Sequence, residues 1–169
     1  EAGALAPNTN APRCTSAGGV LLLGDASYAD GNATLWAAWQ AAATPLLAAS
    51  PTLVLRGNHE ELALRGAKGE SLGALTAVWT REQLSAEQRT WLAELPLTHV
   101  QGPLLLVHAS ANAPERWHYV EDTRSASRSL DAALDGHPDV RYVLGGHVHE
   151  QTLYYRGKGQ QLMPFKPKA

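Results

Sequence analysis

Residues that can bind a metal follow four short apolar runs, far apart along the chain. Asp25, Asn58 and His108 each stand at or just after the end of one run, and His147 with His149 follows the fourth. In open α/β sheets, ligands bind in the crevice beyond the carboxyl ends of the strands. Side chains distant in sequence can therefore converge there, and the pattern predicts a metal site at one edge of a sheet.

The chemistry of these side chains limits the metal. Imidazole, carboxylate and amide oxygen suit Zn, Fe, Mn or Ni better than Ca, which prefers oxygen ligands alone. Cys14 is the only cysteine, so one chain can build neither a thiolate zinc site nor a disulfide framework. Two metal ions about 3.5 to 4 Å apart can hold both the attacking hydroxide and the phosphoryl oxygens of an in-line displacement. A metal lowers the pKa of bound water from about 16 towards 7, which supplies a nucleophile without Ser or Cys.

The elements that would position these residues alternate between strand and helix. Capping-box patterns at Thr80 and Ser85 predict two helix starts within a helical region at 62–95. The remaining predicted elements are strands at 20–23, 53–55, 97–100, 103–107 and 140–144, helices at 34–49 and 125–134, and a hairpin starting at 152. We therefore predict an α/β fold with a mixed β-sheet flanked by helices.

Composition and charge narrow the function classes. The chain has 169 residues, of which 44% are hydrophobic and 18% charged, so we expect a flexible lead-in at 1–19 followed by one domain at 20–169. The net charge is -2 without a long basic run, which argues against nucleic acid or an anionic membrane as the partner. No apolar run reaches the roughly 20 residues that span a membrane. The oligomeric state stays open.

Four motifs together resemble a known family. Gly24-Asp25, Gly57-Asn58-His59-Glu60, His108 and Gly146-His147-Val148-His149 resemble, in order and strand context, the blocks of calcineurin-like metallophosphoesterases. The region from Trp79 onward looks like bacterial members related to diadenosine tetraphosphatases and protein phosphatases. The block at 24–30 is similar to one of purple acid phosphatases. The resemblance covers nearly all of 20–165 and implies part of the family's β-sandwich.

The resemblance implies a role for each candidate metal ligand. Asp25 would bridge two metals, while Asn58, His108 and His147 would complete the shell of the second metal. His149 would bind the first metal.

The resemblance also implies roles for residues near the metal ligands. His59 would act as general acid or transition-state donor, and Glu60 would orient its imidazole. Tyr28 is a candidate iron ligand, with packing against a tryptophan as the alternative. Arg56 and His118 are candidates for contact with the substrate.

One departure from the family weakens the first metal site. The family begins with an Asp-x-His block that supplies two ligands, and residues 1–24 contain neither Asp nor His. The family's Gly-Ser strand near the C-terminus is also absent. We therefore expect the first site to bind weakly or stay empty and the domain to be truncated at both ends, with the missing block upstream of Glu1 or lost.

The predicted activity is hydrolysis of phosphate esters by metal-bound hydroxide at a dinuclear centre holding Mn, Fe, Zn or Ni. The substrate would be a small molecule or a phosphoprotein, and the location cytoplasmic, or secreted if the protein is like purple acid phosphatases. Two alternatives remain: a non-catalytic domain that binds one metal or phosphate, and a protein-interaction domain without metal. Trp117 and Tyr119 are expected to pack in the core or a lid.

Overall fold

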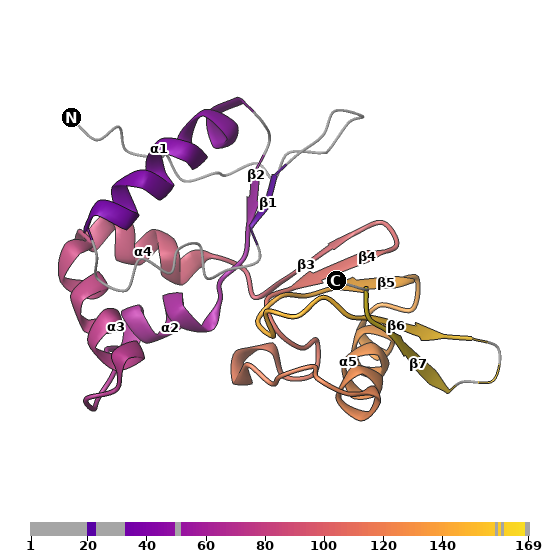
Figure 1. The fold of residues 1–169 in the computed structure, drawn as a ribbon. Coiled ribbons are helices and arrows are strands. Elements are labelled where there is room, and N and C mark those ends of the chain that lie inside the picture. Colours follow the sequence, from indigo (N-terminus) through magenta and orange to yellow (C-terminus); the bar gives the residue numbers. More distant parts are fainter. Residues whose placement is uncertain (1–19, 23–32, 50–51, 158, 160, 168–169) are drawn as a thin grey trace. The chain divides into compact units, whose positions relative to one another are not determined.

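The structure, a computed structural model, describes residues 20–22, 33–49, 52–157, 159 and 161–167 (Figure 1). The chain divides into two compact units. Among the described residues, the first unit takes in 20–22, 33–49, 52–54 and 60–95, and the second takes in 55–59 and those from 96 onward. The expected lead-in at 1–19 lies outside the described residues, and the single domain stays a prediction. None of the helices in the described ranges has the length and apolar character needed to cross a membrane.

A parallel strand pair opens the first unit. β1 (Val20–Leu22) pairs with β2 (Thr52–Val54), with Leu21 opposite Leu53. Parallel neighbours need a long crossover connection, and α1 (Ala33–Ala49) provides it (Figure 1). The helix continues through Pro45. These three elements agree with those predicted from the sequence.

Three further helices follow β2: α2 (Asn58–Arg65), α3 (Leu72–Gln83) and α4 (Ala86–Glu94). Asn58 and His59 at the start of α2 belong to the second unit, and the remainder of these helices belongs to the first. The predicted capping box of α4 is confirmed, because the Gln88 backbone N–H donates to Ser85 Oγ at 3.1 Å and the Ser85 N–H donates to Gln88 Oε1 at 2.8 Å. The helix start predicted at Thr80 is wrong. Ser71 caps α3 instead, accepting from the Ala74 N–H at 3.3 Å. Thr80 lies within that helix, where backbone N–H groups already have helical partners.

A mixed sheet in the order β3-β4-β5 forms the second unit's scaffold. β3 (Thr98–Gln101) runs antiparallel to β4 (Leu104–Val107), and Gly102 takes a φ of 56° in the turn between them. β5 (Tyr142–Leu144) pairs parallel to β4. The crossover between β4 and β5 contains α5 (Thr123–Gly136). The predicted α/β class with a mixed sheet is confirmed.

The core of the second unit joins this sheet to α5. Leu105, Val107, Ala133 and Val140 form one buried cluster, each no more than 3% exposed. Leu105 and Val107 lie two residues apart on β4, so they share one face of the sheet. Burial of each of the Leu and Val side chains contributes about 1.5 to 3 kcal/mol. This packing fixes the carboxyl end of β4, where the site begins.

The ends of the crossover are also held by hydrogen bonds. Asp122 caps α5 by accepting a hydrogen bond from the Ser125 N–H at 2.7 Å. This bond, together with a second one from the Ser125 hydroxyl, holds the pKa of Asp122 below its usual value.

Beyond the sheet, β6 (Leu153–Arg156) and β7 (Leu162–Phe165) form the predicted hairpin. Arg156 ties it to α5 by donating to Asp131 Oδ1 at 2.7 Å and Ser127 Oγ at 2.8 Å.

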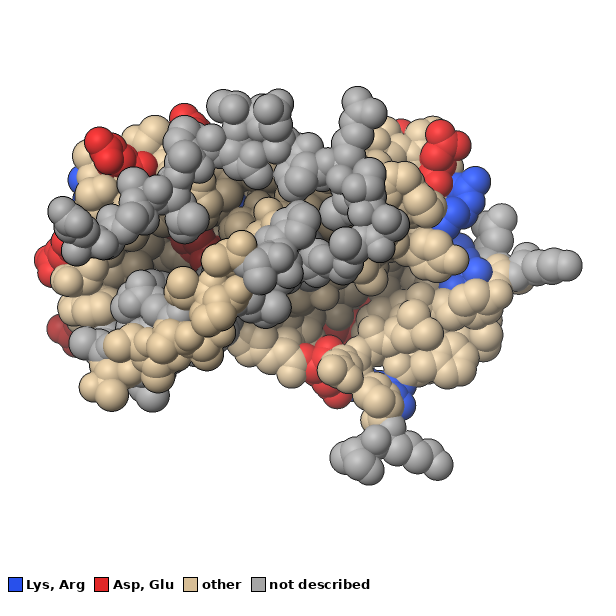
Figure 2. Space-filling view, turned by 90° about the horizontal axis from the view of Figure 1, so that it is seen from above, with Lys and Arg blue, Asp and Glu red and all other residues tan. Residues whose placement is uncertain are grey.

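Charged side chains are scattered over the face drawn in Figure 2. There the described acidic and basic residues lie interspersed among other residues, and neither sign forms a continuous patch.

Candidate functional site

Three of the predicted metal ligands meet at one ring nitrogen. His108 Nε2 lies 2.8 Å from Asn58 Oδ1 and 3.1 Å from His147 Nδ1. The partners stand 50 and 39 positions from His108 in the sequence. Both histidines are buried, with 2% and 8% of their surfaces exposed. The fold therefore gathers a cluster of donor atoms inside the second unit.

The parallel pairing of β4 and β5 explains why the two histidines meet. His108 directly follows β4, and His147 follows β5 after two glycines. The Gly146 N–H donates to the His108 carbonyl at 2.8 Å, which continues the contact beyond the strands. A Cβ on Gly145 would lie 3.0 Å from the Ala109 carbonyl oxygen. Only glycine allows this close approach without displacing backbone.

Asn58 reaches the same place by a different route. It is the first residue of α2. Two residues earlier, the Arg56 N–H donates to the Pro96 carbonyl at 3.0 Å, which holds the segment against the approach to β3. Leu55 is fully buried beside it. This anchored turn presents the amide of Asn58 to His108.

The backbone at His147 is strained. Its φ is 67°, and the Val148 N–H donates to the Gly146 carbonyl at 2.8 Å across it. A bond from residue i+2 to residue i over a central positive φ defines a γ-turn of the rare, strained form. His149 also has a positive φ, of 58°. Strain of this kind costs about 1 to 3 kcal/mol per residue and collects at functional sites, because there it aims a side chain.

The trio fits the coordination of a transition metal. Ligand atoms about 2.0 to 2.2 Å from one metal, at right or tetrahedral angles, lie roughly 3 to 3.5 Å from each other. The separations at His108 Nε2 come close to this range. A single N–H could not serve both neighbours well, whereas one cation can bind all three atoms. Among the described residues, no three His, Cys, Asp or Glu side chains form a metal-holding group, so the trio depends on the Asn58 amide.

The predicted ligands of the first metal are Asp25, Tyr28 and His149. Asp25 and Tyr28 lie outside the described residues. His149 is described, and it is exposed two positions after His147. Their assignment to a first metal stays a prediction.

The remaining predicted site residues lie in α2, just before it, or in the loop after β4. His59 and Glu60 are neighbours in the first turn of α2, both half-buried. Arg56 is half-buried and His118 is exposed. The roles assigned to these four residues stay predictions.

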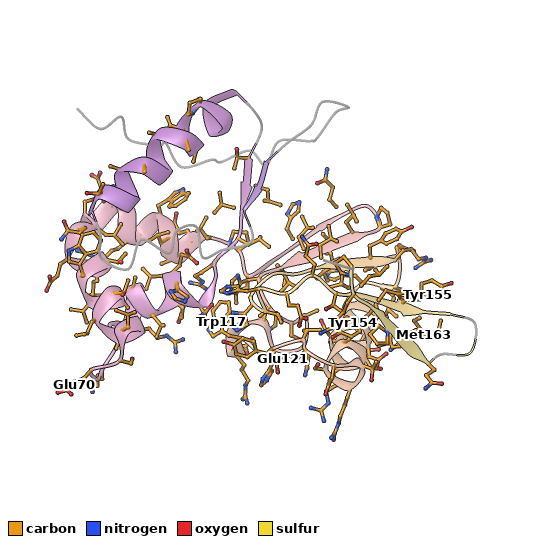
Figure 3. All side chains as sticks on the ribbon, viewed as in Figure 1. Glu70, Trp117, Glu121, Tyr154, Tyr155 and Met163 are labelled. Carbon is orange, nitrogen blue, oxygen red and sulfur yellow. The ribbon has the colours of Figure 1, made fainter. Side chains whose placement is uncertain are left out.

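Two aromatic residues pack against the histidines, and the sequence did not indicate that contact. Tyr119 stacks on His147 with ring centroids 4.1 Å apart, and Trp117 meets the His108 ring edge-on at 5.8 Å. Both belong to the segment between β4 and α5, where Figure 3 labels Trp117. The short 3-10 helix η1 (Pro114–Arg116) precedes them. In the sequence, the feature that could have indicated this contact is the pair of aromatic residues in the loop that follows His108.

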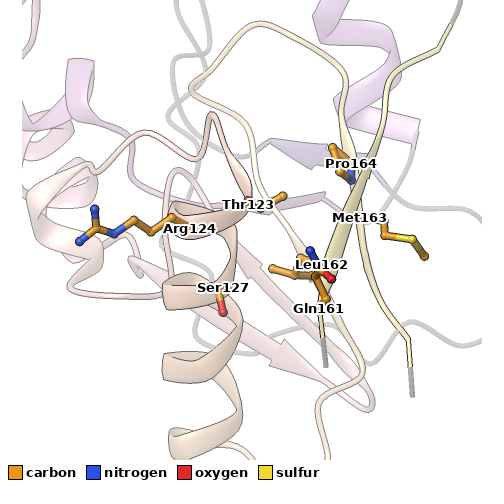
Figure 4. A pocket seen from close by; sticks show the side chains of 7 residues that line it. All are labelled: Thr123, Arg124, Ser127, Gln161, Leu162, Met163 and Pro164. Atoms are coloured by element: carbon orange, nitrogen blue, oxygen red, sulfur yellow. The ribbon is translucent and has the colours of Figure 1, made fainter. Parts of the chain in front are cut away.

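A small polar cavity adjoins this aromatic cover. It measures about 170 Å³ and is lined by Ser110, Asn112, His118, Tyr119, Ser125 and Arg128. A larger cavity of about 430 Å³ lies between the start of α5 and β7 (Figure 4). None of the predicted metal ligands lines the larger cavity. The small cavity meets the histidine cluster through Tyr119, which lines it and stacks on His147.

Comparisons with known proteins bear on the family and the fold of the chain. The sequence model of the Metallophos family, described as calcineurin-like phosphoesterase, matches residues 12–151. Among solved structures, the chain is similar to the crystal structure of a metallophosphoesterase from Sphaerobacter thermophilus, with a TM-score of 0.63 and 24% sequence identity. The match covers 89% of this chain and 58% of that one, and it shows the fold alone. The curated proteins gave no match.

Proposed function

We propose that this chain, which belongs to the calcineurin-like phosphoesterase family, hydrolyses phosphate esters with a metal held by Asn58, His108 and His147. One observation carries the proposal: the amide oxygen and an imidazole nitrogen converge on His108 Nε2 at 2.8 and 3.1 Å. Three segments of the chain contribute to this cluster. A structural histidine pair would not need the strained backbone of His147.

The residues of the chain prepare the site for the reaction. A transition metal, when bound, activates water for attack and stabilises negative charge on phosphoryl oxygens. The buried ring of His108 holds its Nε2 beside Asn58 Oδ1 and His147 Nδ1. Tyr119 and Trp117 hold the two imidazoles in place and shield them from bulk water. His59, at the start of α2, is the proposed donor of a proton to the leaving oxygen.

A dinuclear centre is the finer form of the proposal. Asp25 would bridge the trio to a first metal, with His149 and Tyr28 as further ligands. The family is generally dependent on divalent metals, and the donor set here suits Mn, Fe, Zn or Ni. The proposed substrate is a small phosphate ester or a phosphoprotein, in a cytoplasmic setting.

Metal loading and turnover test the proposal together. The full chain would be loaded with manganese or iron and assayed with aryl phosphate monoesters and diesters, with bound metal measured by elemental analysis. Asn58→Ala and His147→Ala should each lower turnover and metal affinity by roughly tenfold or more, because each removes one of three ligands and loss of a residue that merely supports a ligand already costs about 10 to 100-fold. His137→Ala is the matched control, since His137 is an exposed histidine at the C-terminal end of α5.

The outcomes separate the alternatives. Metal-dependent turnover that survives both ligand substitutions would refute the site. Metal bound through the trio without turnover would favour a non-catalytic domain. No bound metal after loading would favour a protein-interaction domain.

A further inference from the structure

We propose that the small cavity beside His147 binds a second anionic group on the substrate, with Arg128 as the recognising cation. The substrate class is then a small organic bisphosphate, in which one phosphate is hydrolysed and the other anchors the leaving group. This inference rests on the proposed function and deepens it.

The cavity is placed to receive part of a bound ester. Tyr119 lines it and also stacks on His147 at a centroid distance of 4.1 Å. Ser110, another lining residue, follows His108 by two positions and is 3% exposed. Tyr119 is therefore in contact with both the donor cluster and the cavity. A leaving group extending past Tyr119 would enter it.

The lining can recognise an anion. Arg128 makes no hydrogen bond or ion pair with any residue the structure describes, unlike Arg156, which is bound to Asp131. Its guanidinium is therefore available for the paired hydrogen bonds that suit a phosphate. Asn112 and His118 add side-chain N–H donors to the same wall. No Asp or Glu lines the cavity, and the nearby Asp122 carboxylate is engaged by the N–H and the hydroxyl of the lining residue Ser125, both at 2.7 Å.

The size of the cavity limits the anion. Sites for drug-sized ligands measure about 300 to 1,000 Å³, whereas this cavity measures about 170 Å³. It can take a phosphate-sized group but not a nucleoside. The recognised group is therefore compact and charged.

Binding of unreactive analogues tests the inference without requiring turnover. Calorimetry on the manganese-loaded full chain would compare propane-1,3-bisphosphonate with propylphosphonate, which lacks the second anion. The wild-type chain should bind the bisphosphonate roughly tenfold more tightly, the usual gain from a hydrogen bond to a charged group. Arg128→Gln should remove that preference and leave propylphosphonate binding unchanged.

A second arginine on the same helix provides the control. Arg124 lies one turn before Arg128 on α5, is equally exposed and lines the larger cavity (Figure 4). Arg124→Gln should keep the preference for the bisphosphonate. Thermal unfolding of both variants checks that each is folded.

The results distinguish this inference from the proposed function. The inference is overturned if the wild type binds the two analogues equally well or binds neither measurably. It is also overturned if Arg124→Gln and Arg128→Gln lose the preference for the bisphosphonate to the same extent. Turnover of aryl phosphates, measured on the same samples, reports on the proposed function separately. If the chain is active and its preference for the bisphosphonate is unchanged in Arg128→Gln, the proposed hydrolase activity stands and the anion site at the small cavity is refuted.

Discussion

Gly145→Ala gives the sharpest test of how the site is built. The added Cβ would lie 3.0 Å from the Ala109 carbonyl oxygen, and ordinary contacts start at about 3.4 Å. Backbone must therefore move by a few tenths of an ångström, because no flexible side chain is available to yield. The two segments are also tied by the Gly146 N–H bond to the His108 carbonyl at 2.8 Å, so the movement strains a held backbone.

The expected cost follows from this geometry. Overpacking by one methyl group in a tight place destabilises by about 1 to 3 kcal/mol. For a chain of this size that lowers the melting temperature by roughly 2 to 4 °C for each kcal/mol. His147 lies two residues beyond the substitution, so its distance to His108 should grow. Disturbing the support of a ligand typically lowers metal affinity by about 10 to 100-fold.

Gly136→Ala is the matched control. Gly136 ends α5, its φ is not positive, and a Cβ there would meet nothing within 4 Å. Thermal unfolding followed by circular dichroism would measure stability, and manganese titration by calorimetry would measure affinity. Both quantities should fall in Gly145→Ala and stay near wild type in Gly136→Ala. If the two alanine variants bind manganese equally well, the close approach of the strand ends does not position His147.

The other predictions concern stability. Ser129→Ala should destabilise by about 1 to 3 kcal/mol, because the Ala111 N–H loses the Ser129 Oγ that accepts from it at 2.9 Å; urea unfolding measures this, and an unchanged midpoint would contradict it. Ser85→Ala should cost about 1 kcal/mol in the same assay through loss of the α4 cap, a prediction that fails if α4 stability is unaffected. The hydrogen bond from Arg156 lowers the pKa of Asp131 in the folded protein. The ionised Asp131 therefore stabilises the folded state fully above the pKa of Asp131 in the unfolded chain, near 3.8. This stabilisation is lost as the pH falls through the lower pKa of the folded protein. The stability gap between wild type and Asp131→Asn should thus be at most about 1 kcal/mol at pH 6, as for exposed ion pairs, and shrink towards pH 3; a gap that widens with acid would refute this.

Local chemistry made most elements of this chain predictable. The turn at Gly102 needs a positive φ, which glycine adopts freely, and the capping box at Ser85 satisfies the first N–H groups of α4. The same reasoning failed at Thr80, because a Thr followed three positions later by Gln also occurs inside a helix. Ser71, closer to the preceding turn, caps α3. A short pattern identifies a possible cap, and the surrounding chain decides which one is used.

For the candidate site too, some properties follow from the sequence and others only from the folded structure. The sequence by itself determined the family, the α/β class and the donor residues, because these depend on residue types placed directly after apolar strands. Only the tertiary structure decided that Asn58 and His147 meet at His108 Nε2 and that His147 takes a strained backbone. It also decided that Tyr119 stacks on His147 and lines a cavity together with Arg128. Those facts depend on which strands pair and on where a loop packs. Contacts between residues far apart in the chain leave no local pattern, so the folded structure was needed to reveal them.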